Sequence, residues 1–373
     1  MKQRLLDPSA LPTTQKAIIQ DPSGHPKITH TVPLPTLGPG NLLVKVSMVA
    51  LNPYDFKMGS AFPCPGAVVG NDFVGRVVEI HDPRQTSTDV RVGDVVCGLV
   101  HGSNPWDPNN GAFAEFLRVP ADLVLKVPRG LEMSDAAGLG SALATACVAL
   151  WGDGGLQVGF TPEAPAREGE AEPVLVYGGS TATGTMALQL LRASGVPCFA
   201  TCSPRNSELV KGFGAAGVFD YAEADVAQRI RRETGGELQC ALDVIADRES
   251  AACCLAAIGR VGGRLVCLEA CPEEWRTRRT VEVKCPIALE VFGKEIRVLR
   301  GGERATGYER PASAETRAAA VRCFAMFQRL LDDGRLRAHP VKVLPAGFQS
   351  VVDGLMVLKS GSVSGCKLVV PLV

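Results

Sequence analysis

The sequence feature that most constrains the fold is a short apolar run that leads into a glycine-rich turn and then into a helix. Residues 174–177 are apolar, residues 178–184 have the composition of a tight turn, and residues 186–194 place apolar side chains at helical spacing. Further strands of this kind are expected at 196–201, 217–220, 240–245 and 263–268. Strands that alternate with helices predict a parallel sheet covered by helices on both faces.

The first 150 residues have a different pattern, in which short Val- and Leu-rich runs alternate with Pro- and Gly-rich turns. Strands are expected there at 41–46, 73–80, 94–100 and 111–116. Ser134 is expected to cap a helix rich in small residues that ends near residue 151. The pattern of the first 150 residues therefore predicts a β-rich domain.

After residue 160 the chain contains a loop, the strand–helix alternation and a helix, and its last residues again have a pattern of mixed short elements. The polar, proline-bounded stretch 162–173 is expected to be an exposed loop, and an amphipathic helix is expected near 313–334. The remaining residues form mixed short elements. The simplest topology is an α/β domain over 161–310 inserted into a discontinuous β-rich domain made of 1–160 and 311–373.

Composition limits the class of protein. The chain has 373 residues, 46% of them hydrophobic, and its 39 basic residues balance its 39 acidic residues. A net charge of zero argues against a general nucleic-acid binder. The sequence shows neither a signal peptide nor an apolar run of about 18 residues, so no membrane span is expected. Its 13 cysteines include no C-x-x-C pair, and we expect reduced thiols in a cytoplasmic protein.

The turn after the first α/β strand occupies the frame of a dinucleotide-binding fingerprint. Gly179 and Gly184 take the outer glycine positions of G-x-G-x-x-G, whereas Thr181 replaces the middle glycine. Phosphates would then lie at the N-terminus of the following helix, where free N–H groups favour anions. Ser180, Thr181 and Thr183 could add hydroxyl groups. A tight turn that binds no ligand remains the alternative.

The end of the second α/β strand indicates which dinucleotide is preferred. An acidic residue there would bind a ribose 2′-hydroxyl and favour NAD. This chain instead has Ser203, Pro204, Arg205 and Asn206. Because a guanidinium group can pair with a 2′-phosphate, NADPH is favoured over NADH. The alternative is that Arg205 is an ordinary surface charge.

Several segments together resemble a known superfamily, the medium-chain dehydrogenases/reductases, in its zinc-free quinone-reductase-like branch. They follow one another in the family order and span nearly the whole chain: 50–57, 70–77, 92–96, 111–115 and 178–184. The segments 174–183, 200–204, 257–263 and 364–370 are similar to the stand-alone enoyl reductases that act in trans with fungal polyketide synthases.

The resemblance implies a GroES-like β-rich catalytic domain with an inserted Rossmann NADPH-binding domain. It also implies an activity, the NADPH-dependent reduction of the α,β-double bond of a polyketide thioester. The partners would be a polyketide synthase, or a polyketide–peptide hybrid, and its acyl carrier protein, and the enzyme would be a monomer. Two alternatives stay open: an NADPH-dependent reductase of quinones or small enones, and a non-catalytic nucleotide-binding subunit.

A metal site is not expected. Zinc-containing members of the superfamily use Gly-His-Glu where this chain has Gly70, Asn71 and Asp72. Cys97 and His101 form a C-x-x-x-H pair, but a zinc site needs three or four ligands. The carbonyl of the substrate would therefore be activated by hydrogen bonds, side-chain charge or the cofactor.

The resemblance also implies which residues form the site. Those expected to contact the cofactor are Pro53, Tyr54, Asp55, Phe56, Ser180, Thr181, Ala182, Thr183, Ser203, Pro204, Arg205, Asn206, Tyr221, Leu268, Glu269, Val363 and Ser364. Those expected to line the substrate cleft are Ser141, Ala142, Leu143, Ala144, Thr145, Ala146, Cys147, Val148, Ile287, Ala288, Leu289, Glu290 and Val291. Small residues over 141–148 would leave room for an acyl chain, although they would equally permit close helix packing.

Lys57 is the expected catalytic residue, because its ammonium group could hydrogen-bond the cofactor ribose or stabilise an enolate. The alternative is a surface lysine. A basic patch of Arg276, Arg278 and Arg279 is a hypothesis for the docking of an acidic carrier protein.

Overall fold

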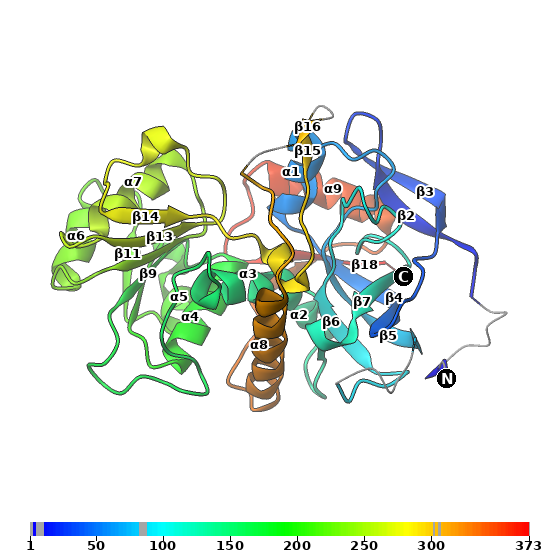
Figure 1. Cartoon of the computed structure of the whole chain (residues 1–373), viewed down its shortest axis with the longest axis horizontal. Helices are drawn as coiled ribbons and strands as arrows, with labels where there is room; N and C mark the ends of the chain where they lie inside the picture. The colour runs from blue at the N-terminus through cyan, green and yellow to red at the C-terminus, as the bar shows by residue number, and fades with distance from the viewer. Residues whose placement is uncertain (1–2, 5–10, 82–87, 301–302, 305–306, 373) are drawn as a thin grey trace.

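The structure, a computed structural model, describes residues 3–4, 11–81, 88–300, 303–304 and 307–372. Figure 1 shows two lobes side by side, with the middle of the chain on one side and both ends of the chain on the other. The α/β fold with a GroES-like and a Rossmann-type part, expected from the sequence, is confirmed.

The first lobe is built on a six-stranded parallel sheet, as the alternating pattern predicted. Its strands are β9 (Val174–Tyr177), β10 (Cys198–Cys202), β11 (Gly217–Asp220), β12 (Cys240–Asp243), β13 (Gly263–Cys267) and β14 (Val281–Lys284). They lie in the order β11-β10-β9-β12-β13-β14. The order reverses direction at β9, and ligands bind outside the carboxyl ends of the strands at such a switch point.

Helices cover both faces of this sheet. They are α4 (Ala182–Ala193), α5 (Ser207–Gly212), α6 (Val226–Glu233) and α7 (Arg248–Ala257). Val174 and Val176 of β9 belong to the core that includes α4, whereas Leu175 and Tyr177 belong to the core that includes α6 and α7. Because successive side chains of a strand point to opposite faces, an unbroken apolar strand fits a sheet that is buried on both sides.

The second lobe is built on a mixed sheet that takes strands from both ends of the chain. The strands of its main path are β4 (Asn41–Ala50), β5 (Asp72–Ile80), β6 (Val95–Leu99), β8 (Val124–Lys126), β17 (Val341–Val343) and β18 (Lys367–Pro371), while β1 (Gln3–Arg4) and β7 (Phe116–Pro120) pair off this path. The C-terminal β18 runs antiparallel to β4. The tail therefore rejoins the first part of the chain, as an inserted domain requires.

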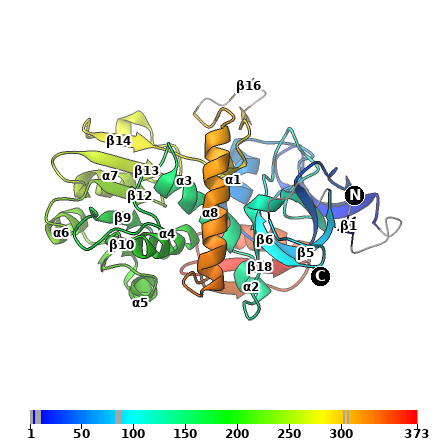
Figure 2. The same ribbon diagram turned by 60° about the horizontal axis from the view of Figure 1, so that its bottom comes forward.

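The remaining helices and strands lie around the second sheet or between the two lobes (Figure 2). They are β2 (Thr14–Gln20), β3 (Pro26–Pro33), β15 (Leu299–Arg300), β16 (Glu303–Arg304), α1 (Pro53–Ala61), α2 (Met133–Ala136), α3 (Leu139–Trp151), α8 (Ala314–Asp332) and α9 (Phe348–Lys359). The helix expected near 313–334 is confirmed as α8, and Ser313 caps it by accepting a hydrogen bond from the Thr316 N–H at 3.0 Å. The stretch 162–173 is confirmed as a loop.

Two local predictions are wrong. The strand expected at 111–116 begins only at Phe116, because the preceding backbone bonds outside this sheet: the Phe113 N–H donates to the Val69 carbonyl. Ser134 caps no helix, since α2 begins after Glu132 and α3 after Gly138. The domain limits near 160 and 310 stay predictions, because α3 and α8 lie between the lobes (Figure 2).

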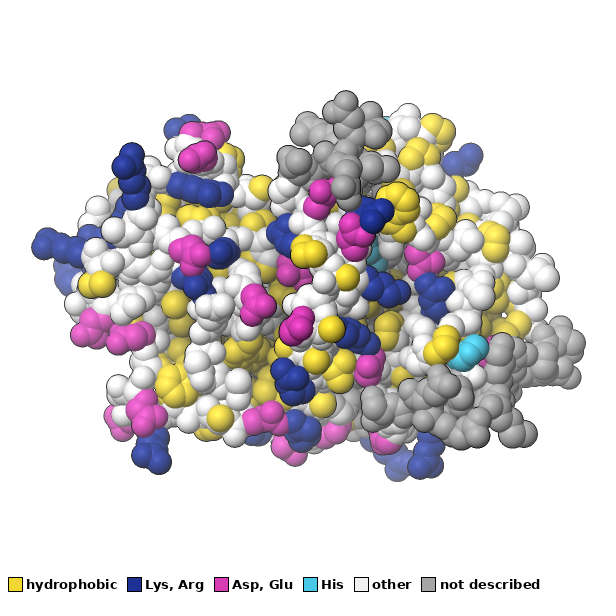
Figure 3. Space-filling view, in the orientation of Figure 1, with side chains coloured by type: hydrophobic (Ala, Val, Ile, Leu, Met, Phe, Trp, Pro, Cys, Tyr) yellow, Lys and Arg dark blue, Asp and Glu magenta, His cyan; other side chains and the backbone are white. Residues whose placement is uncertain are grey.

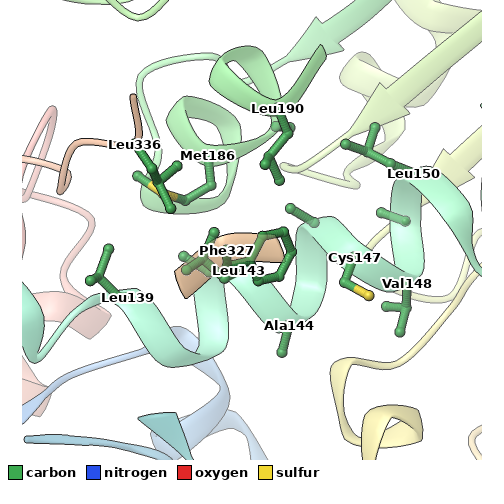
Figure 4. Packing of buried hydrophobic residues seen from close by; sticks show 14 of the residues in the cluster. Leu139, Leu143, Ala144, Cys147, Val148, Leu150, Met186, Leu190, Phe327 and Leu336 are labelled. Carbon is green, nitrogen blue, oxygen red and sulfur yellow. The ribbon is translucent and has the colours of Figure 1, made fainter. Parts of the chain in front are cut away.

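Helix α3 is the core element between the lobes. Its side chains pack against α4 and α8, and Leu143 lies beside Phe327 of α8 (Figure 4). The helical stretch Met133–Trp151 is long and apolar enough to span a membrane, but 72% of that window is buried inside the structure. Packing within the protein thus accounts for its apolar composition.

Candidate functional site

A cavity of about 1240 Å³ lies between the two lobes. Its wall includes α1, the start of α3, the turn after β9, and residues that follow the carboxyl ends of β10, β12 and β13. The loop 363–366 and the first residues of β18 complete it. The cavity therefore extends from the switch point of the parallel sheet to α1 and β18 of the second lobe.

The turn after β9 is held by its own threonine. The Thr181 hydroxyl donates to the Gly178 carbonyl at 2.8 Å and accepts from the Gly184 N–H at 3.0 Å. A Cβ on Gly184 would lie 2.3 Å from the Gly178 carbonyl oxygen, so only glycine allows this close approach. Thr181, which stands at the position of the middle glycine, thus caps α4 with its hydroxyl. The hydroxyl groups of Ser180 and Thr183 make no such cap, and both residues line the cavity.

The end of the cavity at the parallel sheet is formed by the segments after β10 and β11. Arg205 is exposed on the cavity wall and makes no ion pair with any residue in the described part of the chain. Asn206 is buried, and its amide donates to Ser203 Oγ at 3.2 Å and to Ser364 Oγ at 3.0 Å. Asn206 therefore connects the segment after β10 to the loop 363–366. Ser203, Arg205 and Ser364 line the cavity.

Most residues expected to contact the cofactor line this cavity, and four do not. The lining ones are Pro53, Tyr54, Ser180, Thr181, Ala182, Thr183, Ser203, Arg205, Tyr221, Leu268, Glu269, Val363 and Ser364. The four outside the wall are Asp55, Phe56, Pro204 and Asn206. Asp55 is 4% exposed, and its carboxyl group accepts the Asn52 N–H at 2.7 Å at the start of α1. Burial, with the nearby Asp72 charge, raises the pKa of Asp55 to about 8.

Fewer residues line the cavity than were expected to line the substrate cleft. Ser141, Thr145, Ile287, Ala288 and Leu289 line the cavity. The residues that do not are Ala142, Leu143, Ala144, Ala146, Cys147, Val148, Glu290 and Val291. On α3 the small residues pack into the core between the lobes, so close helix packing is the better account of them. Glu290 pairs with Arg310 at 3.1 Å.

Lys57 reaches across the cavity to the other lobe. Its ammonium group forms an ion pair with the Glu269 carboxylate, which follows β13, and both side chains are partly exposed. Lys57 is therefore neither a free surface lysine nor a free catalytic cation in this state. Because exposed ion pairs contribute only about 0–1 kcal/mol, this contact can open when a ligand enters.

A buried polar cluster beside the cavity was not identified from the sequence. The Lys367 ammonium donates to Asp72 Oδ2 at 2.6 Å and to Asn52 Oδ1 at 2.7 Å. Asp72 Oδ1 accepts the Ser141 N–H at 2.6 Å, and Asp72 Oδ2 also accepts the Asn52 amide at 3.0 Å. The Asp72 and Lys367 side chains are 0% and 6% exposed. One buried ion pair thus joins β5, β18, the cap of α1 and the start of α3.

The described residues contain no group of three or more His, Cys, Asp or Glu side chains that could hold a metal ion. Cys97 is buried in β6, and burial raises its pKa well above the usual range of a thiol. Burial, with the nearby Lys294 charge, lowers the pKa of His101 to about 4. His101 is therefore a neutral imidazole at physiological pH.

Comparison with known proteins identifies the family. The chain matches the alcohol dehydrogenase GroES-like domain over residues 38–129 and the zinc-binding dehydrogenase model over residues 182–283. It is 44% identical over 363 residues to the trans-enoyl reductase poxP of Penicillium oxalicum, covering 97% of this chain and 94% of that protein. The chain belongs to the trans-enoyl reductases of the medium-chain dehydrogenase/reductase superfamily.

Other trans-enoyl reductases, such as ffsC of Aspergillus flavipes, are 40–43% identical over nearly their whole length. The fold is also that of solved structures. The CurK enoyl reductase matches with a TM-score of 0.70 at 18% identity, covering 97% of this chain and all of that one. Mycobacterial Rv1454c in complex with NADPH matches with a TM-score of 0.67 at 21% identity, covering 96% of this chain and 99% of that one. Like other trans-enoyl reductases, this family member is an oxidoreductase.

Proposed function

We propose that this trans-enoyl reductase uses NADPH to reduce the α,β-double bond of an acyl chain held as a thioester on the acyl carrier protein of a polyketide synthase or polyketide–peptide hybrid. The observation that carries the proposal is the large cavity that joins the glycine turn after β9 to the apolar wall formed by Ile287, Ala288 and Leu289, in a chain 44% identical to a trans-enoyl reductase. An extended cofactor and a substrate both need such a space.

The described residues fit NADPH. The N-terminus of α4 offers free N–H groups for the pyrophosphate, and Ser180 and Thr183 add hydroxyls. Arg205 is exposed and unpaired among the described residues, which suits it to a 2′-phosphate. Tyr221 is 51% exposed on the same wall, where its ring can cover the adenine.

The substrate half of the cavity suits an acyl chain. NADPH, when bound, supplies a hydride for the β-carbon, and the α-carbon then takes a proton. Ile287, Ala288 and Leu289 form an apolar wall that positions the chain and excludes water. The ammonium of Lys57, released from Glu269, can stabilise negative charge on the thioester oxygen or hydrogen-bond the cofactor ribose.

The partner is proposed from the relatives and not from surface charge. Basic and acidic side chains alternate over the face shown in Figure 3. The guanidinium groups of Arg276 and Arg278 donate to backbone carbonyls at Cys271, 2.9 Å, and Gly259, 2.6 Å. Two of the three arginines of the suggested basic patch are thus engaged within the protein, and we do not propose that patch for carrier docking. A monomeric, cytoplasmic enzyme is part of the proposal.

The test is a comparison of substrates with purified protein. NADPH oxidation is followed at constant protein concentration with an enoyl thioester, a free quinone and a small enone. Reduction of the thioester with the highest kcat/KM supports the proposal. Fast reduction of quinones with an inert thioester would make the protein a quinone reductase, whereas NADPH binding without turnover of any substrate would indicate a regulatory subunit.

A further inference from the structure

Two buried polar atoms in the cavity wall have no hydrogen-bond partner among the described residues. Asn71 Oδ1 and Ser103 Oγ are buried without a partner in the described structure, and the residues are 5% and 1% exposed. Both residues line the large cavity. A buried polar group without a partner is unfavourable, so each of these atoms calls for a ligand or an ordered water.

The two residues lie on neighbouring segments of the second lobe. The Val100 N–H donates to the Asn71 carbonyl at 2.8 Å, and the Ser103 N–H donates to the Val68 carbonyl at 2.7 Å. Segments 68–71 and 100–103 therefore run side by side, with His101 between the two polar groups along the strip. Ser103 has a φ of 56°, a left-handed conformation that side chains rarely adopt. Such strained residues are concentrated at functional sites.

The hydrogen-bonding groups of Asn71 and Ser103 indicate which kind of ligand they would bind. Asn71 Oδ1 needs an N–H or O–H donor, and the Ser103 hydroxyl can donate to a carbonyl oxygen. A secondary amide presents both a donor and an acceptor, and it would satisfy the pair even with the Asn71 amide turned over. Free quinones and small enones offer only acceptors. An acyl chain on a carrier protein is different, because its phosphopantetheine arm contains two amides beyond the sulfur.

A second cavity could connect the large cavity to the protein surface. A space of about 400 Å³ adjoins the large one and shares His101, Leu289, Ile296 and Arg297 with it. Its wall includes exposed residues, with Trp106 58% exposed and Lys294 at the surface. Lys294 makes no ion pair with any residue that the structure describes, so its charge is available to a phosphate.

We propose that the phosphopantetheine arm of the carrier lies along Asn71, His101 and Ser103 and leaves through the smaller cavity beneath Lys294. The amide nearest the sulfur binds Asn71 and Ser103, and the terminal phosphate lies by Lys294. This inference rests on the proposed function, since it concerns how the same site recognises a carrier-bound thioester.

Three thioesters of one enoyl acid test the amide contact and the exit. The first carries N-acetylcysteamine, the second a matched thiol in which CH₂ replaces the amide N–H, and the third phosphopantetheine. The wild-type enzyme is expected to prefer the first over the second by about tenfold in kcat/KM, the equivalent of about 1.4 kcal/mol. Asn71→Leu and Ser103→Ala are each expected to reduce this preference to about twofold or less, because the ratio of the two kcat/KM values cancels any effect that the two thioesters share.

Lys294→Ala is expected to raise KM for the phosphopantetheine thioester at least about threefold at low salt and to leave the N-acetylcysteamine thioester unchanged. Lys27→Ala, an exposed lysine on β3, is the matched control and is expected to change neither. Urea unfolding of each variant establishes that it is folded.

The outcomes separate this inference from the proposed function. If no enoyl thioester is reduced, the proposed function fails. If thioesters are reduced but the amide and CH₂ forms react equally, water fills the pair and the inference fails alone. Equal losses on both forms in Asn71→Leu would place Asn71 against the acyl group and would also overturn the inference. A Lys294→Ala effect on all three thioesters would refute the exit route.

Discussion

The buried ion pair of Asp72 and Lys367 gives the sharpest test of how the site is held together. Lys367→Met keeps a side chain of similar length but removes the cation, which donates at 2.6 Å to Asp72 and at 2.7 Å to Asn52. The Asp72 carboxylate, 0% exposed, then keeps only neutral donors. Removing one partner of a buried pair costs about 3–5 kcal/mol, and we expect a loss of that size in the free energy of unfolding.

The double variant Lys367→Met/Asp72→Asn is the matched control. An asparagine oxygen can still accept the Ser141 N–H, and no charge is left buried. Replacing both partners of a buried pair is often close to neutral, so the double variant should recover to within about 1–2 kcal/mol of the wild type. Urea unfolding followed by tryptophan fluorescence and circular dichroism measures each value.

Two results would refute this reasoning. If Lys367→Met costs less than about 1 kcal/mol, water reaches the carboxylate and the pair is not effectively buried. The single variant Asp72→Asn completes the set. If the loss of stability in the double variant equals the sum of the losses in Lys367→Met and Asp72→Asn, the residues do not interact energetically, because coupled residues deviate from additivity.

Three further predictions concern the cofactor turn, cofactor choice and pH. Arg205→Ala should raise KM for NADPH about 10- to 100-fold with little effect on NADH, as expected for loss of a charged hydrogen bond; equal effects on both cofactors in steady-state kinetics would place Arg205 elsewhere. Gly184→Ala places a Cβ 2.3 Å from the Gly178 oxygen and should cost about 1–3 kcal/mol in urea unfolding and weaken NADPH binding, whereas Gly212→Ala, with open space around it, should do neither. Burial raises the folded pKa of Asp55 to about 8, so the unfolded chain loses this proton first and the contribution of Asp55 to stability falls as pH rises from about 4 to 8. Asp55→Asn should therefore gain stability relative to the wild type as pH rises through that range in urea unfolding, and a difference between the two proteins that does not change with pH would contradict the assignment.

Local sequence patterns predicted the elements that depend on neighbouring residues. The apolar run at β9 and its glycine turn specified a strand, a turn and a helix within about 20 residues of chain. Ser313 was not singled out, yet the helix that it caps was predicted from the spacing of its apolar side chains. The strand placed at 111–116 failed because its backbone bonds to a segment about 40 residues earlier, which no local pattern records.

The sequence by itself determined the two-lobed plan, the turn that would hold a dinucleotide and the arginine at its far end, since each depends on residue types at short fixed spacing. Only the tertiary structure decided which residues meet. Lys367 and Asp72 lie 295 positions apart, and Lys57 finds Glu269 across 212. Which side chains of α3 face the cavity depended on α4 and α8 covering its other sides. Asn71 and Ser103 likewise became candidates for a ligand only when folding buried them without partners, because burial turns an ordinary polar side chain into one that requires a partner.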